Sequence, residues 1–247
     1  MSEFAVLLPA AGKSSRFHDR ENKPFATLDG RAVWLRTAEL FVTRSDVAEV
    51  VLIIASDDTE RFKQRYAANL AFMNVRIAPG GKERFESVAN ALAMLGPNAK
   101  YVAVHDVVRP CVRTEQIDSV FGAAKQFGAA LLAAKIPDTV KRVGAGQKIQ
   151  ETVSREGLWL AQTPQVFRRD WLEEAYGRRD KLGQAITDDA QLVEAIGKPV
   201  YAVEGTADNI KITTKNDLAL AGAILKARPE PKAARPIHPF ADEEMWK

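Results

Sequence analysis

The chain begins with an apolar run from Phe4 to Leu8, which leads directly into a turn of small residues from Pro9 to Gly12. An apolar run of this length that ends in a turn predicts a buried strand. The turn is followed by two hydroxyl groups and three cations, which belong to Lys13, Ser14, Ser15, Arg16 and Lys23. Small residues leave backbone N–H groups uncovered, and such donors with positive charge favour binding of a polyphosphate. A tight turn with a solvated basic edge is the alternative interpretation.

Two nucleotide-binding motifs do not match this turn. Gly12 to Ser14 resembles the end of a Walker A loop, but that motif requires a glycine five positions before Gly12, where Leu7 stands. The dinucleotide-binding fingerprint requires three glycines, and the turn has one. A phosphate-binding loop of another kind remains.

Length and composition limit the class of protein. The 247 residues suffice for one large domain or two small ones. Hydrophobic residues make up 46% and charged residues 27%, as in ordinary globular proteins. The net charge of +3, from 35 basic and 32 acidic residues, is too balanced for a protein that binds nucleic acid. We therefore expect no nucleic-acid partner.

The cysteine content and the N-terminal segment bear on the compartment. A single cysteine, Cys111, excludes an intrachain disulfide and fits a reducing environment. The N-terminal segment lacks the basic region of a signal peptide, and no apolar run approaches the ~18 residues of a membrane helix. We expect a soluble, cytoplasmic protein without a membrane partner.

Strand-like and helix-like segments alternate along the first half of the chain. The predicted strands cover residues 4–8, 49–55, 75–78, 101–105 and 129–134. The predicted helices cover residues 85–95, 114–127 and 57–70, the last of which starts with a capping box of Asp57 and Glu60. This alternation favours an α/β fold with a doubly wound, Rossmann-like and mostly parallel sheet flanked by helices.

The alternation breaks after Pro137. Residues 138–155 resemble two short strands around a turn from Gly144 to Gln147, and polar residues dominate both strands. An isolated hairpin of this kind is marginally stable in water. We therefore expect an arm at about residues 137–156 that leans on a second subunit, with a mobile surface flap as the alternative.

The remaining segments complete one domain. Helices are predicted at 171–179, at 187–196 with Thr187 as the cap, and at 214–226 with a capping box of Thr214 and Asp217. Strands are predicted at residues 200–203 and 209–213. Four of the twelve prolines lie between Ala227 and Phe240. We predict a single domain over residues 1–227 and a proline-rich tail over residues 228–247.

Four polar clusters fall at the carboxyl ends of predicted strands, where α/β sheets bind their ligands. The first is the opening turn. The second, Pro79 to Arg84 with Ser87, suits a base or a phosphate. In the third, Asp106 ends an apolar strand close to Arg109. In the fourth, Lys211 alternates with two isoleucines, and it either contacts an anionic substrate or is solvated.

Asp106 is the candidate ligand of Mg²⁺, because this cation prefers oxygen and bridges to phosphate. A helix cap or an ion pair with Arg109 is the alternative. His105 is interpreted as a core histidine. The sequence has no nucleophile elbow and no Cys–His spacing for zinc. Cations and one carboxylate around a space for phosphate favour phosphoryl or nucleotidyl transfer, in which positioning and charge neutralisation do most of the work.

Seven segments follow one another along the chain: PAAGKSSRF with Lys23, GGKERFESV, VHDVVRPCV, PDTVKR, ETVSREGLWLAQTPQVF, TDDAQLVE and EGTADNIKITTKNDLALA. Taken in this order, they resemble those of the 2-C-methyl-D-erythritol 4-phosphate cytidylyltransferase family of the non-mevalonate isoprenoid pathway. The resemblance extends to about Ala227. It implies a fold of the nucleotide-diphospho-sugar transferase type, with a β-hairpin arm that clasps the other subunit of a homodimer.

The resemblance also implies a role for each matching residue. The residues implied to bind CTP are Pro9, Ala10, Ala11, Gly12, Gly81 and Ser87. The catalytic residues would be Arg16, Lys23 and Asp106, with Asp106 also holding Mg²⁺. The residues implied to bind the polyol phosphate acceptor are Arg109, Thr139, Arg155, Thr163, Thr187 and Lys211, of which Thr139 and Arg155 would come from the neighbouring arm. The implied reaction is in-line attack of the acceptor's phosphate oxygen on the α-phosphorus of CTP, with release of pyrophosphate.

The sequence departs from the family pattern in three ways. Asn22 precedes Lys23 where proline is usual, although the lysine keeps its distance of eleven residues from Gly12. Lys82 stands where an acidic residue is common, which changes the contacts available to the base. Two valines, at 107 and 108, replace small residues after Asp106 and make that loop bulkier near the sugar.

The sequence leaves one alternative function open and disfavours two others. Ribitol-5-phosphate cytidylyltransferases share the fold, the arm and the CTP loop, and their acceptor is also a short polyol phosphate. A Rossmann oxidoreductase is disfavoured, because the first turn lacks the glycines and no Tyr-x-x-x-Lys occurs. A nucleotide-binding regulator without turnover is disfavoured by the joint presence of Arg16, Lys23 and Asp106.

Overall fold

The computed structural model describes residues 2–12, 23–179 and 186–228. Its described residues form a seven-stranded sheet with the order β11-β7-β10-β6-β1-β4-β5. The strands are β1 (Phe4–Pro9), β4 (Val47–Ile54), β5 (Val75–Pro79), β6 (Tyr101–Val104), β7 (Ala129–Lys135), β10 (Trp159–Arg168) and β11 (Tyr201–Glu204). Neighbouring strands run parallel except for β10, which is antiparallel to both β6 and β7. The prediction of a Rossmann-like, mostly parallel sheet is confirmed.

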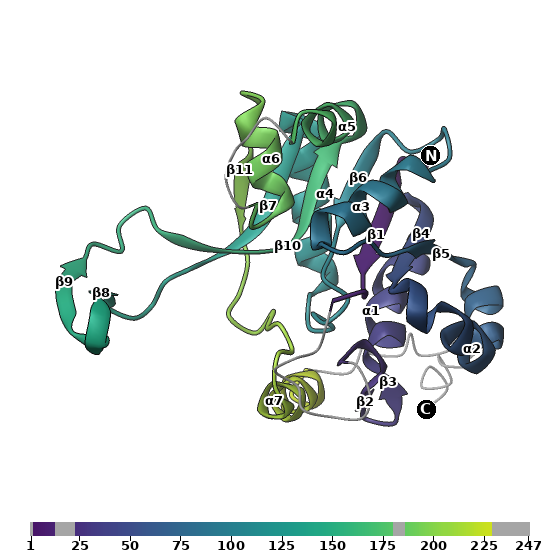
Figure 1. Cartoon of the computed structure of the whole chain (residues 1–247), viewed down its shortest axis with the longest axis horizontal. Helices are drawn as coiled ribbons and strands as arrows, with labels where there is room; N and C mark the ends of the chain where they lie inside the picture. The colour runs from purple at the N-terminus through teal and green to yellow at the C-terminus, as the bar shows by residue number, and fades with distance from the viewer. Residues whose placement is uncertain (1, 13–22, 180–185, 229–247) are drawn as a thin grey trace, which may run out of the picture.

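Helices flank this sheet (Figure 1). They are α1 (Val33–Val42), α2 (Thr59–Met73), α3 (Arg84–Ala93), α4 (Thr114–Phe127), α5 (Arg169–Gly177), α6 (Asp189–Ala195) and α7 (Lys215–Lys226). Short elements are η1 (Lys23–Phe25), η2 (Ser56–Asp58) and the paired strands β2 (Thr27–Leu28) and β3 (Arg31–Ala32). The bounds of α4 agree with the prediction.

Alternate residues of β1 pack into two hydrophobic clusters, one on each face of the sheet. Phe4, Val6 and Leu8 lie with buried side chains of α1, α2 and α4. Ala5 and Leu7 lie with those of α3, α5 and α6. Successive side chains of a strand point to opposite faces, so a strand that is buried on both faces has an unbroken apolar sequence. The fully buried opening run is therefore the middle of a helix–sheet–helix sandwich.

The sequence does not predict β10, although it lies in the interior of the sheet. Its residues include Gln162, Thr163, Pro164 and Gln165, and proline cannot donate a hydrogen bond to a neighbouring strand. The pairing with β7 is irregular between Ala161 and Gln165, so the polar segment lies where the ladder is interrupted. The buried side chains of this segment contribute to the site described below.

Two predicted helix starts have different outcomes. The capping box predicted for Asp57 and Glu60 is wrong, because residues 56–58 form η2 and α2 begins without a side-chain cap. The capping box predicted for Thr214 and Asp217 is confirmed at the start of α7. There the Asp217 carboxylate accepts hydrogen bonds that fix the turn.

Thr187 is not the cap that was predicted for α6. The cap is Asp188, whose carboxylate accepts a hydrogen bond from the Gln191 backbone N–H. Thr187 instead donates from its backbone nitrogen and its hydroxyl to Gln191 Oε1, at 2.8 and 3.1 Å. Thr187 therefore lies outside the helix and is exposed.

The strand predicted at residues 209–213 is wrong. The Ile212 N–H donates to the Val108 carbonyl at 2.9 Å, which ties the segment to the loop after β6. Ile210 and Ile212 pack with α7 in a third hydrophobic cluster. The alternation around Lys211 therefore reflects packing of a loop on a helix, and it does not reflect a place in the sheet.

The hairpin predicted after Pro137 projects from the domain as an arm (Figure 1). Strands β8 (Val140–Val143) and β9 (Ile149–Val153) pair antiparallel around η3 (Ala145–Gln147). None of the residues 136–158 is buried. Two apolar side chains of the arm, Val143 and Ile149, are 55% and 58% exposed. The arm therefore contributes nothing to the core of its own subunit.

The tail predicted at residues 228–247 lies, apart from Arg228, outside the described residues, and the division into one domain and a tail stays a prediction. Across the described ranges, no helix is long and apolar enough to cross a membrane.

Candidate active site

The turns that follow β1 and β5 touch one another at the carboxyl edge of the sheet. Ala10 N donates to Ile53 O at 2.9 Å, and Gly80 N donates to Ile54 O at 2.7 Å, so both turns are bound to the end of β4. A Cβ atom on Gly80 would lie 2.4 Å from the Cβ of Ala11. The glycine therefore allows the two turns to approach, and the first two predicted clusters form one surface. Pro9 ends β1 below this surface, and Gly12 is exposed on it.

Gly81 and Ser87 shape the second turn from within. Gly81 N donates to Ser87 Oγ at 3.0 Å, and this hydroxyl donates to Glu83 O at 3.0 Å. A Cβ atom on Gly81 would lie 2.4 Å from Glu86 Cβ, so a larger residue does not fit without movement. Ser87 is buried, and its hydroxyl therefore supports the turn at the start of α3.

Asp106 follows β6 and lies among three cations. Lys211 Nζ is 2.8 Å from Asp106 Oδ2, Arg109 Nε is 3.5 Å from the same oxygen, and Arg84 Nε is 4.0 Å from Oδ1. Burial alone would raise the pKa of Asp106, but the positive charges of these neighbours outweigh it and lower the pKa to about 2. The carboxylate is therefore ionised at neutral pH. The sequence left open whether Lys211 contacts an anionic substrate or is solvated. In the structure it contacts Asp106, which belongs to the third predicted cluster.

Thr163 and His105 hold the backbone on either side of Asp106. Asp106 N donates to Thr163 Oγ1 at 3.0 Å, and His105 Nδ1 is 3.2 Å from the same hydroxyl. If the threonine hydroxyl donates to Nδ1, the Nε2–H of His105 can donate to Arg109 O at 3.2 Å. Burial lowers the pKa of His105 to about 4, so the imidazole is neutral near pH 7. The interpretation of His105 as a core histidine is confirmed.

Arg109 is held by Asn209, which is held in turn by Gln162, and the sequence assigned no role to either of these two residues. Its NH1 group donates to Asn209 O at 2.6 Å. Asn209 is fully buried, and its Nδ2 donates to Gln162 Oε1 at 3.1 Å and to Thr163 O at 3.0 Å. Gln162 lies in β10, which the sequence did not predict, and Asn209 lies in a short loop, and no sequence motif marks an uncharged amide at either place. The only sequence signal for Asn209 is its position two residues before Lys211.

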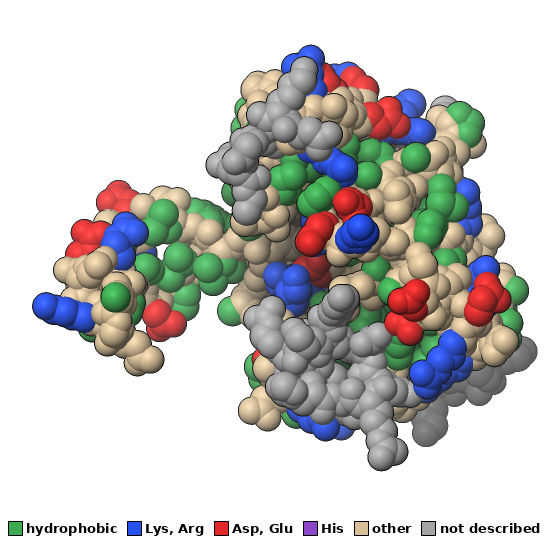
Figure 2. Space-filling view, in the orientation of Figure 1, with side chains coloured by type: hydrophobic (Ala, Val, Ile, Leu, Met, Phe, Trp, Pro, Cys, Tyr) green, Lys and Arg blue, Asp and Glu red, His purple; other side chains and the backbone are tan. Residues whose placement is uncertain are grey.

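Arg84 and Asp189 extend the group towards α6. Arg84 opens α3, and its NH2 group donates to Asp189 Oδ2 at 2.7 Å. Asp189 is the first residue of α6 and is 1% exposed. Figure 2 shows acidic and basic side chains gathered around a hollow in this face of the molecule. The arginine was part of the second predicted cluster without a role, and the aspartate was missed.

Several predicted residues do not meet Asp106 within this chain. Thr139 and Arg155 lie in the arm, where the Arg155 guanidinium donates to the Pro137 carbonyl. Thr187 lies before α6, in contact with Gln191. Arg16 and the side chain of Lys23 lie outside the described residues.

The two valines after Asp106 belong to the core. Val107 is 1% exposed, and its carbonyl accepts a hydrogen bond from Thr37 Oγ1 at 2.7 Å. Val108 is partly buried between two hydrophobic clusters. The expectation that these valines make the loop bulkier near a sugar is therefore not supported by their packing, because both contact the interior.

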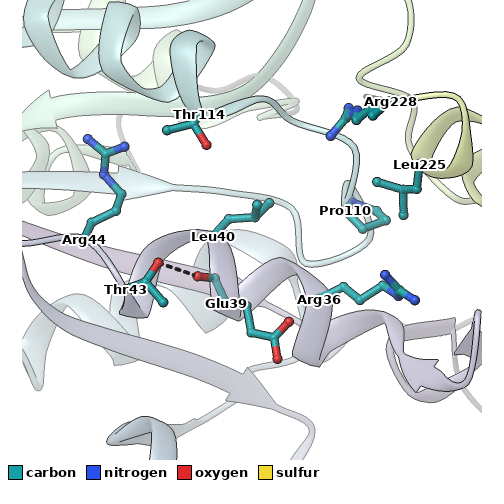
Figure 3. A pocket seen from close by; sticks show the side chains of 9 residues that line it. All are labelled: Arg36, Glu39, Leu40, Thr43, Arg44, Pro110, Thr114, Leu225 and Arg228. Carbon is teal, nitrogen blue, oxygen red and sulfur yellow. Dashed lines mark hydrogen bonds between the residues drawn. The ribbon is translucent and has the colours of Figure 1, made fainter. Parts of the chain in front are cut away.

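A cavity of about 420 Å³ lies elsewhere, between α1, α7 and the start of α4 (Figure 3). It is lined by Arg36, Glu39, Leu40, Thr43, Arg44, Pro110, Thr114, Leu225 and Arg228. None of the predicted site residues whose side chains the structure describes lines it.

Comparison with known proteins identifies the family of the chain. A family model described as 2-C-methyl-D-erythritol 4-phosphate cytidylyltransferase matches residues 4–227. A relative of that name from Rhodopirellula baltica is 42% identical over 233 residues, which are 90% of this chain and 94% of the relative. One from Pelotomaculum thermopropionicum is 40% identical over 229 residues, with 92% and 96% covered.

Solved structures give the same result. The 2-C-methyl-D-erythritol 4-phosphate cytidylyltransferase from Thermus thermophilus has a TM-score of 0.74 and 35% identity, with 90% of this chain and 98% of that chain covered. The 4-diphosphocytidyl-2C-methyl-D-erythritol synthase from Anaerococcus prevotii has a TM-score of 0.77 and 29% identity, with 91% and 96% covered.

Fold and site together define a nucleotidyltransferase of the nucleotide-diphospho-sugar type, whose carboxylate after β6 is held by cations. The chain belongs to the 2-C-methyl-D-erythritol 4-phosphate cytidylyltransferase family.

Proposed function

We propose that this chain transfers CMP from CTP to 2-C-methyl-D-erythritol 4-phosphate, giving 4-diphosphocytidyl-2-C-methyl-D-erythritol and pyrophosphate for isoprenoid biosynthesis. The observation that carries the proposal is the carboxylate of Asp106 beneath Lys211, Arg109 and Arg84, beside the joined turns after β1 and β5. Both substrates are anions, and clustered cations reduce their repulsion. Membership of the family supports the same reaction.

The joined turns form the proposed nucleotide side. Its residues are Pro9, Ala10, Ala11, Gly12, Gly81 and Ser87. The contact of Ala11 with Gly80 supports a single surface, and Ser87 acts by holding the turn. Arg16 and Lys23 follow the first turn in sequence. We assign them to the triphosphate and to the negative charge that develops on the α-phosphorus.

The cations on Asp106 belong to the proposed acceptor side. Lys211 and Arg109 carry the charge that attracts the acceptor's phosphate, and Thr163 acts by holding the Asp106 backbone. Thr187, before α6, completes this side. The partner subunit's Thr139 and the partner subunit's Arg155 would reach it from the arm.

The reaction is one in-line displacement. A phosphate oxygen of the acceptor forms a bond to the α-phosphorus of CTP while the bond from that phosphorus to the bridging oxygen of the β-phosphate breaks. Pyrophosphate carries the electron pair away. The acceptor itself is the nucleophile, so the protein contributes positioning and charge, which suffice for large accelerations of phosphoryl transfer.

Mg²⁺ fits this site as a proposed cofactor. No group of three or more His, Cys, Asp or Glu side chains suited to a metal occurs in the described part of the chain. Mg²⁺ is commonly held by one or two carboxylates together with substrate phosphates, so one aspartate is enough. Asp106 Oδ2 takes the close contact of Lys211, whereas Oδ1 has Arg84 Nε at 4.0 Å. Asp106 would hold the ion, which would neutralise charge on the phosphates.

A homodimer through the arm at residues 137–156 is the proposed assembly. The arm has no buried residue in its own subunit, yet it carries Val143 and Ile149 on its surface. After the arm come Leu158 and the first two residues of β10, Trp159 and Leu160, and these three side chains are 41%, 36% and 53% exposed. A second subunit would cover these apolar groups. A cytoplasmic location stays a prediction from the sequence.

Pyrophosphate release tests the proposed function. We expect release with CTP, Mg²⁺ and methylerythritol phosphate, and none with the other nucleoside triphosphates. Ribitol 5-phosphate and a hexose 1-phosphate serve as alternative acceptors. Preference for ribitol phosphate would replace the acceptor in the proposal, and absence of release with every pair would favour a nucleotide-binding protein without turnover.

A further inference from the structure

Behind Arg84 lies a line of buried polar groups to which the proposed reaction assigns no role. Tyr176 OH donates to Asp189 Oδ1 at 2.5 Å, and Asp189 Oδ2 accepts from Arg84 NH2 at 2.7 Å. Tyr176 is 8% exposed and Asp189 is 1% exposed. The three residues come from α5, α6 and α3, so the line crosses three helices on one face of the sheet.

Asp189 is held rigidly at its backbone as well as at its carboxylate. Its N–H donates to Gln165 Oε1 at 3.2 Å, and the N–H of Ala190 donates to the same oxygen at 3.0 Å. Gln165 is itself 2% exposed, and its Nε2 donates to Asp188 Oδ2 at 2.9 Å. Protein hydrogen bonds therefore hold the buried Asp189 carboxylate in one position, and the carboxylate fixes the Arg84 group that it binds.

Arg84 lies at one end of this line, next to Asp106. Its side chain is 33% exposed, and its Nε lies 4.0 Å from Asp106 Oδ1. A guanidinium has five N–H donors in one plane, and it loses little freedom when one edge is already fixed. Contact with Asp189 fixes one edge, so other donors of Arg84 are available at the boundary between the proposed nucleotide and acceptor sides.

Tyr176 is suited to hold its partner at all working pH values. Burial raises the pKa of the Tyr176 hydroxyl, and the negative charge of Asp189 raises it further. The hydroxyl therefore remains a donor. Burial lowers the pKa of Arg84, but the charges of Asp189 and Asp106 outweigh this effect and raise it, so the guanidinium remains charged.

We propose that Tyr176 and Asp189 are positioning residues that aim the Arg84 guanidinium at a phosphate group of the bound substrates. The inference rests on the proposed function, because it takes the substrates to be phosphate esters that meet beside Asp106. Arg84 would touch the phosphate, whereas Tyr176 and Asp189 act only through Arg84.

A double-mutant cycle tests this dependence. We expect Tyr176→Phe to lower kcat/KM about tenfold through loss of one hydrogen bond to a charged group. Arg84→Ala should lower it about a hundredfold or more, as loss of a transition-state donor does. In the Arg84→Ala background, Tyr176→Phe should change kcat/KM by less than about twofold, because the residues act as one unit. Equal effects of Tyr176→Phe in both backgrounds would overturn the proposal.

Chemical rescue distinguishes positioning from a structural role. Guanidinium ion added at concentrations far below denaturing should restore part of the activity of Arg84→Ala, because the Asp189 carboxylate remains to bind it. The same addition should fail with Arg84→Ala combined with Asp189→Asn. Equal rescue of both variants, or of neither, contradicts the role of Asp189.

Tyr66→Phe is the matched control for Tyr176→Phe. Tyr66 is also 8% exposed but lies in α2, and its substitution should leave kcat/KM unchanged.

Calorimetric affinities separate this inference from the proposed function. Tyr176→Phe should weaken binding of CTP or of methylerythritol phosphate when Arg84 is present, and not when it is alanine. If the unaltered protein releases no pyrophosphate with any substrate pair, the proposed function fails, and these affinities still decide the inference. Unchanged affinities for both ligands in Tyr176→Phe, together with unchanged kinetics, would refute it.

Discussion

Lys211→Met removes the ammonium group that lies 2.8 Å from Asp106 Oδ2 while it keeps most of the aliphatic side chain. Asp106 is only 11% exposed, so its charge depends on protein cations for compensation. Of the effects that lower the pKa of Asp106, the charge of Lys211 is the largest. Without it, Arg109 Nε at 3.5 Å and Arg84 Nε at 4.0 Å remain.

The size and sign of the effect follow from the pKa. The pKa of Asp106 is lowered from 3.8 to about 2, and this shift corresponds to roughly 2 kcal/mol of stability. Because the folded pKa is depressed, the contribution is complete above the unfolded pKa and is lost as the pH falls towards 2. In Lys211→Met we expect the free energy of unfolding at pH 7 to fall by an amount on the order of this net shift, because the largest of the effects that lower the pKa is lost while burial, Arg109 and Arg84 remain. The pH at which acid unfolds the protein should rise, because fewer positive charges then oppose the effect of burial, which raises the pKa of Asp106.

Urea unfolding at pH 7, 5, 4 and 3 measures both effects, and kcat/KM on the same samples should fall about a hundredfold. Lys226→Met is the matched control. Lys226 Nζ lies 3.1 Å from Asp29 Oδ1 in an exposed pair, whose loss should cost less than about 1 kcal/mol. A pH profile of unfolding that is identical in Lys211→Met and the unaltered protein would refute the electrostatic reasoning.

Three further predictions concern the nucleotide side and the arm. Lys23→Ala should reduce turnover by orders of magnitude with an unchanged melting temperature, and near-normal turnover would remove Lys23 from the mechanism. Gly80→Ala should raise the KM for CTP about tenfold, because the new Cβ would lie 2.4 Å from that of Ala11; Gly122→Ala, with nothing within 4 Å, is the control with unchanged KM. Mixed dimers of Lys23→Ala and Arg155→Ala subunits should regain activity that neither homodimer has, and failure to regain it would argue against a site shared between subunits.

The sheet was predictable where side chains follow a simple period. The run at Phe4 to Leu8 is apolar throughout because both of its faces are covered, and the sequence therefore indicated a buried strand. The same reasoning failed for β10, in which Gln162, Thr163 and Gln165 are polar and buried. These side chains form hydrogen bonds at the site, so the strand is buried without being apolar, and a hydrophobicity pattern does not reveal it. Residues 209–213 show the opposite error, in which a period of two arose from packing on α7.

The site was predictable where a residue type has few other uses. A carboxylate at the end of an apolar strand indicated Asp106. The alternation of Lys211 with two isoleucines left contact with an anionic substrate and solvation equally open, and the structure places its Nζ 2.8 Å from Asp106 Oδ2. Asn209 and Asp189 were missed, because their importance comes from contacts with residues 13 to 105 positions away in the chain. No local spacing encodes such contacts, and sequence alone gives a buried aspartate and an exposed one the same pattern.

The most direct test of the central claim follows the oxygen atoms of the reaction. The acceptor is supplied with ¹⁸O in its phosphate group, and the products are separated and analysed by mass spectrometry and ³¹P NMR. Attack of the acceptor's phosphate on the α-phosphorus of CTP predicts that all of the label stays in the cytidylyl product, in a diphosphate linkage, and that the released pyrophosphate is unlabelled. Label in the pyrophosphate, or a product that contains a single phosphorus atom, would contradict the account.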